Sequence, residues 1–374
     1  MVYLDYAANT PVDKEVLDKF YDTLLNNYGN PNSTHQMGVD AKELIDSATA
    51  KIASLLGATS EEIIYTSGAT EANNLALRGV CERYKDRGKH ILLSTLEHSS
   101  LMASAAVMQE QGFEVELIPV DEQGLINVQE LKNMIRPDTI FVSVVSVDSE
   151  LGLVQPIEEI GRLLKEYPNI IFHTDASQSV GKVSIDFSNV DLVTVSPHKF
   201  YGINDLGILI KRKEIGLKPI IFGGRSTTVF RSGTPNTASI VSASLALEKA
   251  TINLQNRYNY VKQLNKVLVQ FLKSYPQVHV NNNENSIPYV INFSVKGVTS
   301  HRVVDLLNQK GIYLSSKTSC CPVGAPSKLV YAMTRDNSLA ASSIRLSLSF
   351  LTTPEELEEF GNTFDEVLEE IMNV

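Results

Sequence analysis

Two charged side chains stand directly after apolar runs that are typical of buried strands. Asp175 follows the run IIFHT, and Lys199 follows the run LVTVSPH. In an open parallel sheet, ligands bind beyond the carboxyl ends of the strands, so both side chains are expected at that edge. There a carboxylate and an amine could serve opposite ends of one ligand. A surface ion pair is the simpler alternative for these two residues taken alone.

The stretch IIYTSGATEANNLAL adds a candidate site for an anion. It predicts a strand that ends at Thr66, a turn SGAT, and a helix that starts near Glu71. Backbone N–H groups at a helix start, with the hydroxyls of Ser67 and Thr70, bind phosphate well, although Gly and Thr are also ordinary capping residues. Neither GxGxxG nor GxxxxGK(S/T) occurs, so a dinucleotide or a nucleoside triphosphate is not indicated. A phosphate cradle, a carboxylate and a lysine together indicate a pyridoxal 5'-phosphate (PLP) site.

The elements that must position these groups alternate along the first two-thirds of the chain. Apolar runs separated by amphipathic helical patterns predict an α/β fold with a mainly parallel seven-stranded sheet, covered on both faces. The predicted strands are 62–67, 90–95, 114–119, 140–146, 170–175, 192–196 and 207–211.

A smaller α+β domain is expected after a long helical stretch that begins near residue 238. Its predicted strands lie near 288–294, 312–315 and 343–348. Its last helix should begin with Thr353 as N-cap, Pro354 in the first turn and Glu356 completing a capping box.

Composition excludes several classes of protein. The 374 residues include 43% hydrophobic and 20% charged residues, which is ordinary for a globular protein. A formal net charge of −10 argues against a nucleic-acid surface and gives no support for binding to an anionic membrane. No apolar run is long enough for a transmembrane helix, and no signal peptide is visible. Three cysteines form neither a disulfide framework nor a zinc signature, so we expect a cytoplasmic protein without a metal.

Eight motifs occur in the order found in cysteine desulfurases of the NifS/IscS type. They are YLDYAANTPV, YGNPNSTHQMG, YTSGATEANNLAL, LEHSS, HTDASQSVGK, SPHKFYG, FRSGTPNT and SSIRLSLS. The chain therefore resembles the class V aminotransferase group of fold-type I PLP enzymes, nearly end to end. The resemblance implies a large PLP-binding domain over 12–255. It also implies a small domain, formed by 1–11 and 256–374, that carries a loop with the catalytic cysteine.

The resemblance assigns roles around the cofactor ring. It implies that Lys199 forms the Schiff base, that Asp175 pairs with the pyridinium nitrogen and that Gln178 bonds the phenolic oxygen. His98 resembles the histidine that stacks on the ring and moves protons, whereas a lone histidine after a strand is more often structural. Ser149 stands where the family has an asparagine that touches the ring oxygen, and its reach is shorter.

Other matches concern the two ends of the ligand. The positions that match phosphate-binding residues are Ala69, Thr70, Ser196 and His198. Thr234 matches a residue that reaches the phosphate of the neighbouring subunit, which implies a homodimer. Arg345 matches the arginine that holds the substrate carboxylate, a task suited to its bidentate fork.

The segment GIYLSSKTSCCPVG occupies the place of the family's catalytic thiol. Counting from its two serines puts Cys320 at that position, with Cys321 one residue later, whereas Cys81 lies in a helical pattern and is expected to be structural. The implied reaction converts L-cysteine to L-alanine and leaves a persulfide on Cys320. The sulfur would then pass to an acceptor, such as a cluster scaffold or a tRNA-thiolation protein, for iron–sulfur cluster, thio-cofactor or tRNA biosynthesis.

Several positions depart from the family pattern. Besides Ser149, Pro197 replaces the usual glycine before the histidine of the lysine motif, GINDLG replaces GPKG, and KTSCC replaces a run of small residues. These changes leave open two alternatives. One is a selenocysteine lyase or another class V PLP enzyme, and the other is a non-catalytic sulfur-transfer subunit that retains the fold.

Overall fold

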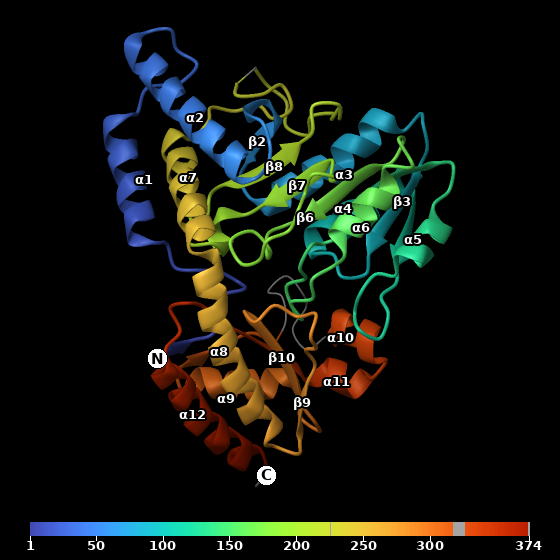
Figure 1. Ribbon diagram of the computed structural model, residues 1–374, viewed down its shortest axis with the longest axis vertical. Helices are drawn as coiled ribbons and strands as arrows, with labels where there is room; N and C mark the ends of the chain where they lie inside the picture. The colour runs from blue at the N-terminus through green and yellow to red at the C-terminus, as the bar shows by residue number, and fades with distance from the viewer. Residues whose placement is uncertain (225, 317–325, 373–374) are drawn as a thin grey trace.

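A seven-stranded sheet forms the centre of the larger part of the molecule (Figure 1). The computed structural model describes residues 1–224, 226–316 and 326–372. The strands of this sheet run in the order β2-β8-β7-β6-β5-β3-β4. Their bounds are β2 (Ile63–Thr66), β3 (His90–Ser94), β4 (Glu114–Ile118), β5 (Thr139–Ser143), β6 (Ile171–Asp175), β7 (Leu192–Val195) and β8 (Gly207–Lys211).

Only β8 runs against the others in this sheet. It pairs antiparallel with both β2 and β7. All other neighbouring pairs are parallel: β7 with β6, β6 with β5, β5 with β3, and β3 with β4. The strand β2 therefore points the same way as β7, and the carboxyl ends of six strands share one edge. The prediction of a mainly parallel seven-stranded sheet is confirmed.

Apolar side chains alternate between the two faces of the sheet, because successive residues of a strand point to opposite sides. In β3, Leu92 belongs to one core, while Ile91 and Leu93 belong to the other. One face is covered by α1 (Lys14–Asn26), α2 (Gln36–Leu55), α5 (Val128–Met134), α6 (Ile157–Leu164) and α7 (Thr237–Ile252). The other face is covered by α3 (Ala69–Tyr84) and α4 (Ser99–Glu110).

A second, smaller sheet lies in the lower part of Figure 1 and has its own apolar core. It has the order β12-β10-β9, with all neighbours antiparallel. Its strands are β9 (Val278–Val280), β10 (Val290–Val295) and β12 (Ser343–Ser347). The predicted strand near 312–315 exists as β11 (Ile312–Tyr313), but it pairs parallel with β1 (Val2–Tyr3) at the N-terminus.

Helices link and cover the smaller part. The long helical stretch breaks at Asn253 into α7 and α8 (Leu254–Lys273), and α8 leads from one part into the other (Figure 1). The remaining helices are α9 (Ser300–Gln309), α10 (Lys328–Thr334), α11 (Asn337–Ser342) and α12 (Pro354–Met372). The predicted capping box of α12 is confirmed: the Thr353 backbone N–H donates to Glu356 Oε2 at 3.0 Å, and the Glu356 N–H donates to Thr353 Oγ1 at 3.2 Å.

The N-terminal segment connects the two parts. Asp5 forms a bridge with Ser347 of β12, and the Ala7 N–H donates to Ser347 Oγ at 2.9 Å. Further along, Thr10 Oγ1 donates to the carbonyl of His198 at 2.8 Å, next to the end of β7. Across the described ranges, none of the helices combines the length and the apolar character needed to cross a membrane.

Candidate active site

A cavity of about 400 Å³ lies at the carboxyl edge of the large sheet. Every site residue predicted from the sequence lines it except Thr234 and Cys320. These lining residues are Ala69, Thr70, His98, Ser149, Asp175, Gln178, Ser196, His198, Lys199 and Arg345. The geometry therefore brings together residues from the carboxyl ends of five strands, β2, β3, β5, β6 and β7, and from the smaller sheet.

Lys199 ends a short 3-10 turn, Pro197–Lys199, that follows β7. Its Nζ donates to the carbonyls of Ala7 and Ala8, at 2.8 and 2.6 Å. The next turn is tight, because Tyr201 has a left-handed φ of 71° and is held there by Thr10 Oγ1, which accepts from its N–H at 2.8 Å. The N-terminal segment thus fixes the amine at the cavity wall.

Asp175 is the last residue of β6 and is 5% exposed. Asn73 Nδ2 donates to its Oδ2 at 2.8 Å, and the backbone N–H of Ser177 donates to its Oδ1 at 2.9 Å. Both donors stabilise the ionised carboxylate, since a carboxylate can only accept. The site therefore presents a buried negative charge on the wall that Lys199 also lines.

His98 is the N-cap of α4, and its Nδ1 accepts the backbone N–H of Ser100 at 3.2 Å. Ser100 Oγ lies 2.9 Å from the same nitrogen. Burial lowers the pKa of His98, and the positive charge of Lys199 adds to this against the opposing effect of Asp175. The lowered pKa favours the neutral imidazole, and the helix that His98 caps orients the ring.

The start of α3 supplies the phosphate end of the cavity. Its N-cap, Gly68, makes no side-chain cap, and Ala69 and Thr70 of the first turn of this 16-residue helix line the cavity. The N–H groups of such a first turn are suited to bind an anion. Close packing requires a glycine at position 207, because a Cβ there would lie 2.4 Å from the carbonyl carbon of Gly68. Burial, followed by the charges of Lys199 and Lys182, lowers the pKa of the neighbouring His198 to about 4.

Arg345 lies at the opposite end, in the middle of β12, and is 1% exposed. Its Nη2 donates to Asp5 Oδ1 at 2.7 Å, and its Nη1 donates to the carbonyl of Ser149 at 3.0 Å. Its Nε is buried without an acceptor among the described residues. An unused donor on a buried cation is what an anionic ligand would satisfy. Ser149 contributes its carbonyl to this arrangement.

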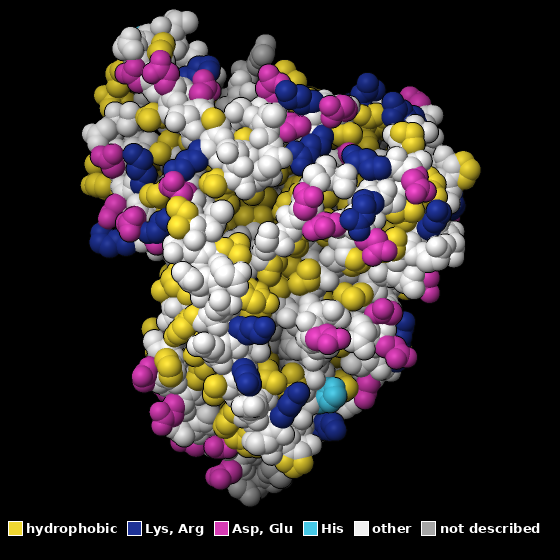
Figure 2. Space-filling model, in the orientation of Figure 1, with side chains coloured by type: hydrophobic (Ala, Val, Ile, Leu, Met, Phe, Trp, Pro, Cys, Tyr) yellow, Lys and Arg dark blue, Asp and Glu magenta, His cyan; other side chains and the backbone are white. Residues whose placement is uncertain are grey.

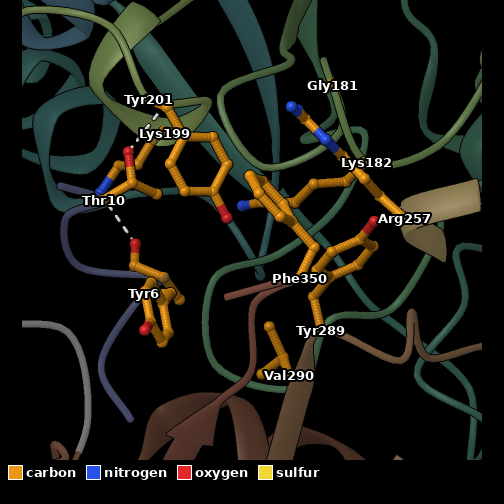
Figure 3. A pocket seen from close by; sticks show the side chains of 11 residues that line it. Tyr6, Thr10, Gly181, Lys182, Lys199, Tyr201, Arg257, Tyr289, Val290 and Phe350 are labelled. Atoms are coloured by element: carbon orange, nitrogen blue, oxygen red, sulfur yellow. Dashed lines mark hydrogen bonds between the residues drawn. The ribbon is translucent and has the colours of Figure 1, made fainter. Parts of the chain in front are cut away.

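A second lysine lies close to Lys199. Lys182 is 7% exposed and donates to Gln178 Oε1, while Gln178 Nε2 donates to the carbonyl of Ala7 at 2.8 Å. Figure 3 shows both lysines around a small neighbouring cavity that is walled by aromatic rings, including those of Tyr201 and Phe350. Burial, followed by the charges of Lys199 and Arg345, lowers the pKa of Lys182 to about 7.

Sequence reasoning missed several residues that shape the site. They are Asp5, Asn73, Ser177 and Lys182. Each lies inside one of the motifs YLDYAANTPV, YTSGATEANNLAL and HTDASQSVGK, so the motifs contained the signal. Spacing could not reveal the roles of Asp5 and Asn73, because their partners Arg345 and Asp175 lie 340 and 102 residues away in the chain.

Two predicted residues stand apart from the cavity. Thr234 is exposed in the segment between β8 and α7 and does not line the cavity. Cys320, with its neighbour Cys321, falls outside the described residues. The role of each stays a prediction.

Comparison with known proteins identifies the family. The model of the aminotransferase class-V family matches residues 2–360. The chain belongs to the class-V aminotransferase family. A relative named cysteine desulfurase IscS, from Dictyoglomus turgidum, is 36% identical over 100% of this chain and 96% of its own length.

Two solved structures give the same result. A structure titled NifS-like protein has a TM-score of 0.93 and 32% identity, covering 98% of this chain and 99% of its own. A structure titled SspA in complex with cysteine has a TM-score of 0.83 and 30% identity, covering 94% of this chain and 100% of its own. The fold-type I architecture expected from the sequence is thereby confirmed.

Family members of this kind depend on PLP, and the cavity fits that cofactor. The N–H groups at the start of α3 suit its phosphate, Asp175 suits a protonated ring nitrogen, and the side chain of Lys199 carries an amine at the cavity wall. Ser177 Oγ, which is buried at the cavity, has no partner within the described part of the chain. The donor set therefore leaves polar atoms for a phosphorylated, ring-shaped ligand, and PLP is the cofactor of this protein.

Proposed function

We propose that the protein is a PLP-dependent cysteine desulfurase that converts L-cysteine to L-alanine and forms a persulfide on Cys320. The observation that carries this proposal is the cavity itself. It joins the amine of Lys199, the carboxylate of Asp175 and the start of α3 at one end to Arg345 at the other. Its two ends match a phosphorylated cofactor and an amino-acid carboxylate.

The reaction moves one sulfur atom between two thiols. The Cβ–S bond of the substrate breaks, its electron pair stays with the carbon, and the carbon gains a proton to give alanine. A new S–S bond forms at Cys320 Sγ, so the transferred sulfur is oxidised as the carbon is reduced, without an external oxidant. PLP, when bound, supplies the electron sink for charge that develops on the substrate.

Residues of the chain hold and move the other groups. Lys199, placed by Ala7 and Ala8, is the amine that binds the cofactor and then moves the proton at Cα of the substrate. Asp175 keeps the pyridine nitrogen protonated, since two donors hold its carboxylate in the ionised form. Gln178 and His98 belong to the same wall and would contact the ring.

Arg345 would bind the substrate carboxylate. Its unused Nε, and the planar fork held in place by Asp5 and Ser149, support this role. Asp5 is in turn fixed by Ser315 Oγ, which donates to its Oδ2 at 2.8 Å. The guanidinium is therefore oriented before any substrate arrives.

Both flanks of segment 317–325, which contains Cys320, attach beside the cavity. On one side, Ser315 exchanges backbone hydrogen bonds with Arg345, at 2.7 and 3.2 Å. On the other side, Ser327 Oγ donates to Glu150 Oε2 at 2.6 Å, next to the cavity residue Ser149. These anchors support the proposal that the thiol of Cys320 acts on a substrate held by Arg345.

A homodimer and an acceptor protein complete the proposal. The helix α1, at the left edge of the molecule in Figures 1 and 2, exposes several large apolar side chains that a second copy could cover. On α1 they are Leu17, Tyr21, Leu24 and Leu25, and the exposed Tyr28 lies just beyond the end of the helix. In such a dimer Thr234 would reach the phosphate of the other subunit. Sedimentation of the PLP-bound protein should show a dimer, and a fully PLP-loaded monomer would contradict this.

We also propose the division into a domain over 12–255 and a domain formed by 1–11 and 256–374. The separate apolar core of the smaller sheet supports it, since that core draws on Val2 and Leu4 as well as on β10 and β12. A reducing, cytoplasmic setting suits the buried free thiol of Cys81. There the persulfide sulfur would pass to an iron–sulfur scaffold or a tRNA-thiolation protein.

Mass analysis after addition of cysteine tests the function. The PLP-loaded protein should release alanine and gain a sulfur adduct on the peptide that contains Cys320. Cys320→Ser should bind PLP yet give neither product, while the matched variant Cys321→Ser should retain substantial activity. The reverse outcome would move the nucleophile by one residue, and two fully active variants would exclude the persulfide mechanism. Alanine without any sulfur adduct would instead indicate a lyase.

A further inference from the structure

A chain of hydrogen bonds runs beneath the cavity from Asp175 to His98. Asn73 Nδ2 donates both to Asp175 Oδ2, at 2.8 Å, and to Ser100 Oγ, at 2.9 Å. Ser100 Oγ in turn lies 2.9 Å from His98 Nδ1. Asn73 is 0% exposed, Ser100 is 7% exposed, and neither lines the cavity, so the two form a buried link between cavity residues. We call this pair the Asn73–Ser100 bridge.

The ionised carboxylate fixes the direction of every bond in this chain. Because a carboxylate can only accept, the Asn73 amide must turn its nitrogen, and not its oxygen, toward Asp175. The two protons of that nitrogen then go to Asp175 and to Ser100 Oγ. Ser100 Oγ accepts one of them, so its single O–H proton is directed to the remaining neighbour, His98 Nδ1.

The same nitrogen of His98 receives a second donor. The backbone N–H of Ser100, which cannot act as an acceptor, points to Nδ1 at 3.2 Å. Two donors on one ring nitrogen leave no place for a proton on it. In the neutral imidazole the proton must therefore be on Nε2, at the other edge of the ring.

We propose that Asn73 is a positioning residue that, through Ser100, holds His98 in the tautomer protonated on Nε2, and that this control depends on the charge of Asp175. What His98 does in turn rests on the proposed function. A neutral ring with its proton on Nε2 donates at that atom, so His98 would give a hydrogen bond or a proton to the bound ligand. Removal of the Cα proton would fall to Lys199.

The tautomer can be read directly by nitrogen NMR of histidine in the full-length, PLP-loaded protein labelled with ¹⁵N-histidine. The signal of His98 is identified by its loss in His98→Gln. At a pH where the ring is neutral, the wild type should show an unprotonated Nδ1 and a protonated Nε2. A wild-type His98 protonated on Nδ1 would overturn the proposal.

Ser100→Ala removes one of the two donors to Nδ1 and breaks the bridge. An ordinary hydrogen bond changes an equilibrium by roughly 2- to 12-fold, so the ratio of the two tautomers should move toward Nδ1–H by that factor. Ser100→Thr keeps the hydroxyl and should restore the wild-type ratio. Ser104→Ala is the matched control, since Ser104 lies one turn later in α4, is 3% exposed, and has no partner for its Oγ within the described ranges. An unchanged tautomer ratio in Ser100→Ala would overturn the proposal.

Two further variants test the hydrogen bonds between Asp175 and Ser100. Asn73→Leu keeps a similar volume without donors, and Asp175→Asn removes the charge that fixes the amide. Each should shift the tautomer ratio in the same direction as Ser100→Ala, and combining either with Ser100→Ala should add little, because all act on one connection. A fully additive double variant would show that the three residues do not act in series.

The outcome separates this proposal from the proposed function. The tautomer is measured without turnover, so a protonated Nδ1 in an active desulfurase would reject the bridge alone. The expected tautomer in a protein that releases no alanine from cysteine would reject the desulfurase alone. In an active enzyme, Ser100→Ala should lower kcat about as far as it shifts the tautomer and leave KM for cysteine unchanged.

Discussion

The two halves of the cavity are built in different ways. In the half that belongs to the large sheet, each functional group directly follows a strand: Asp175 ends β6, Lys199 follows β7, and α3 follows β2. In the other half, Arg345 sits within β12 and is held by Asp5, 340 residues away in the chain. Local chain geometry thus places the groups of the first half, and distant contacts such as that of Lys199 with Ala7 then orient them. In the second half, contacts between distant segments decide both.

This difference indicates in which half of the cavity substitutions can be tolerated without loss of the chemistry. The backbone can leave the end of a buried strand in only a few directions. The fold therefore also fixes the half of the cavity that belongs to the large sheet, which we call the cofactor half. The Arg345 half depends on the N-terminal segment, on Ser149 and on the flank of the segment that contains Cys320. We therefore expect changes in the first half to abolish chemistry or cofactor binding, and changes in the second to alter substrate affinity.

The largest effect is expected from Lys199→Ala, in the cofactor half. Without this amine the proton at Cα has no base, and turnover should fall by more than about 1,000-fold. Alanine release over many turnovers measures this loss. In the wild type, borohydride reduction should leave PLP on the peptide that contains Lys199. Trapping on the peptide of the neighbouring Lys182 would contradict the assignment.

Asp175→Asn tests the same half without removing the amine. An amide cannot keep the pyridine nitrogen protonated, so kcat should fall by about 100- to 1,000-fold while some PLP remains bound. Absorption of the bound cofactor, followed beside alanine release, separates the two effects. Turnover close to that of the wild type would disprove the role given to this carboxylate.

Arg345→Lys probes the other half. The variant keeps the charge but loses the planar fork and its fixed contacts with Asp5 and Ser149. The KM for cysteine should rise about 10- to 100-fold, which corresponds to one charged hydrogen bond, while PLP affinity stays close to that of the wild type. Arg162→Lys, on the exposed side of α6, is the control. Loss of PLP rather than of substrate affinity would mean that the two halves are not separable.

The last test concerns the stability of the protein beneath the cofactor half rather than its chemistry. Burial, followed by the charge of Asp175, raises the pKa of Glu97 to about 8, and Ser143 Oγ donates to its Oε1 at 2.9 Å. The folded protein therefore holds a proton that the unfolded chain releases above its ordinary carboxyl pKa. Stability should fall as the pH rises from about 5 to 8, by up to about 1.4 kcal/mol per pH unit.

The variant Glu97→Gln should lack this pH dependence, because its amide does not titrate. Urea unfolding of the cofactor-free protein at several pH values gives the comparison. The two proteins should be similar near pH 5, and the wild type should become the less stable as the pH rises. Parallel curves would show that Glu97 is ionised in the folded state.

Much of the fold and of the cofactor half could be predicted from the sequence. The strand runs and helix starts are local patterns, and each of the seven predicted strands is present within one or two residues at its start. The capping box at Thr353 is equally local, since both of its bonds span three residues. Lys199 and Asp175 were placed at one edge by the rule for strand ends, and the cavity confirms that placement.

Other features could not be predicted, because no local pattern specifies them. The pairing of β11 with β1, the bond of Lys199 to Ala7 and the contact of Asn73 with Asp175 join segments more than 100 residues apart. Taken alone, each of these side chains or strands would fit an ordinary position at the surface or in the core. Only the position of its partner gives it a role.

The sequence by itself determined the order of strands and helices along the chain, the edge of the sheet at which the cavity lies and the residue types that suit a phosphate and a ring nitrogen. These follow from hydrophobic period and from chain direction at strand ends. The tertiary structure alone decided that Asp5 orients Arg345, that Lys182 lies beside Lys199 and that Asn73 connects Asp175 to His98. The physical reason is that burial, charge coupling and hydrogen-bond direction depend on which distant groups share a low-dielectric interior, and periodicity carries no information on that.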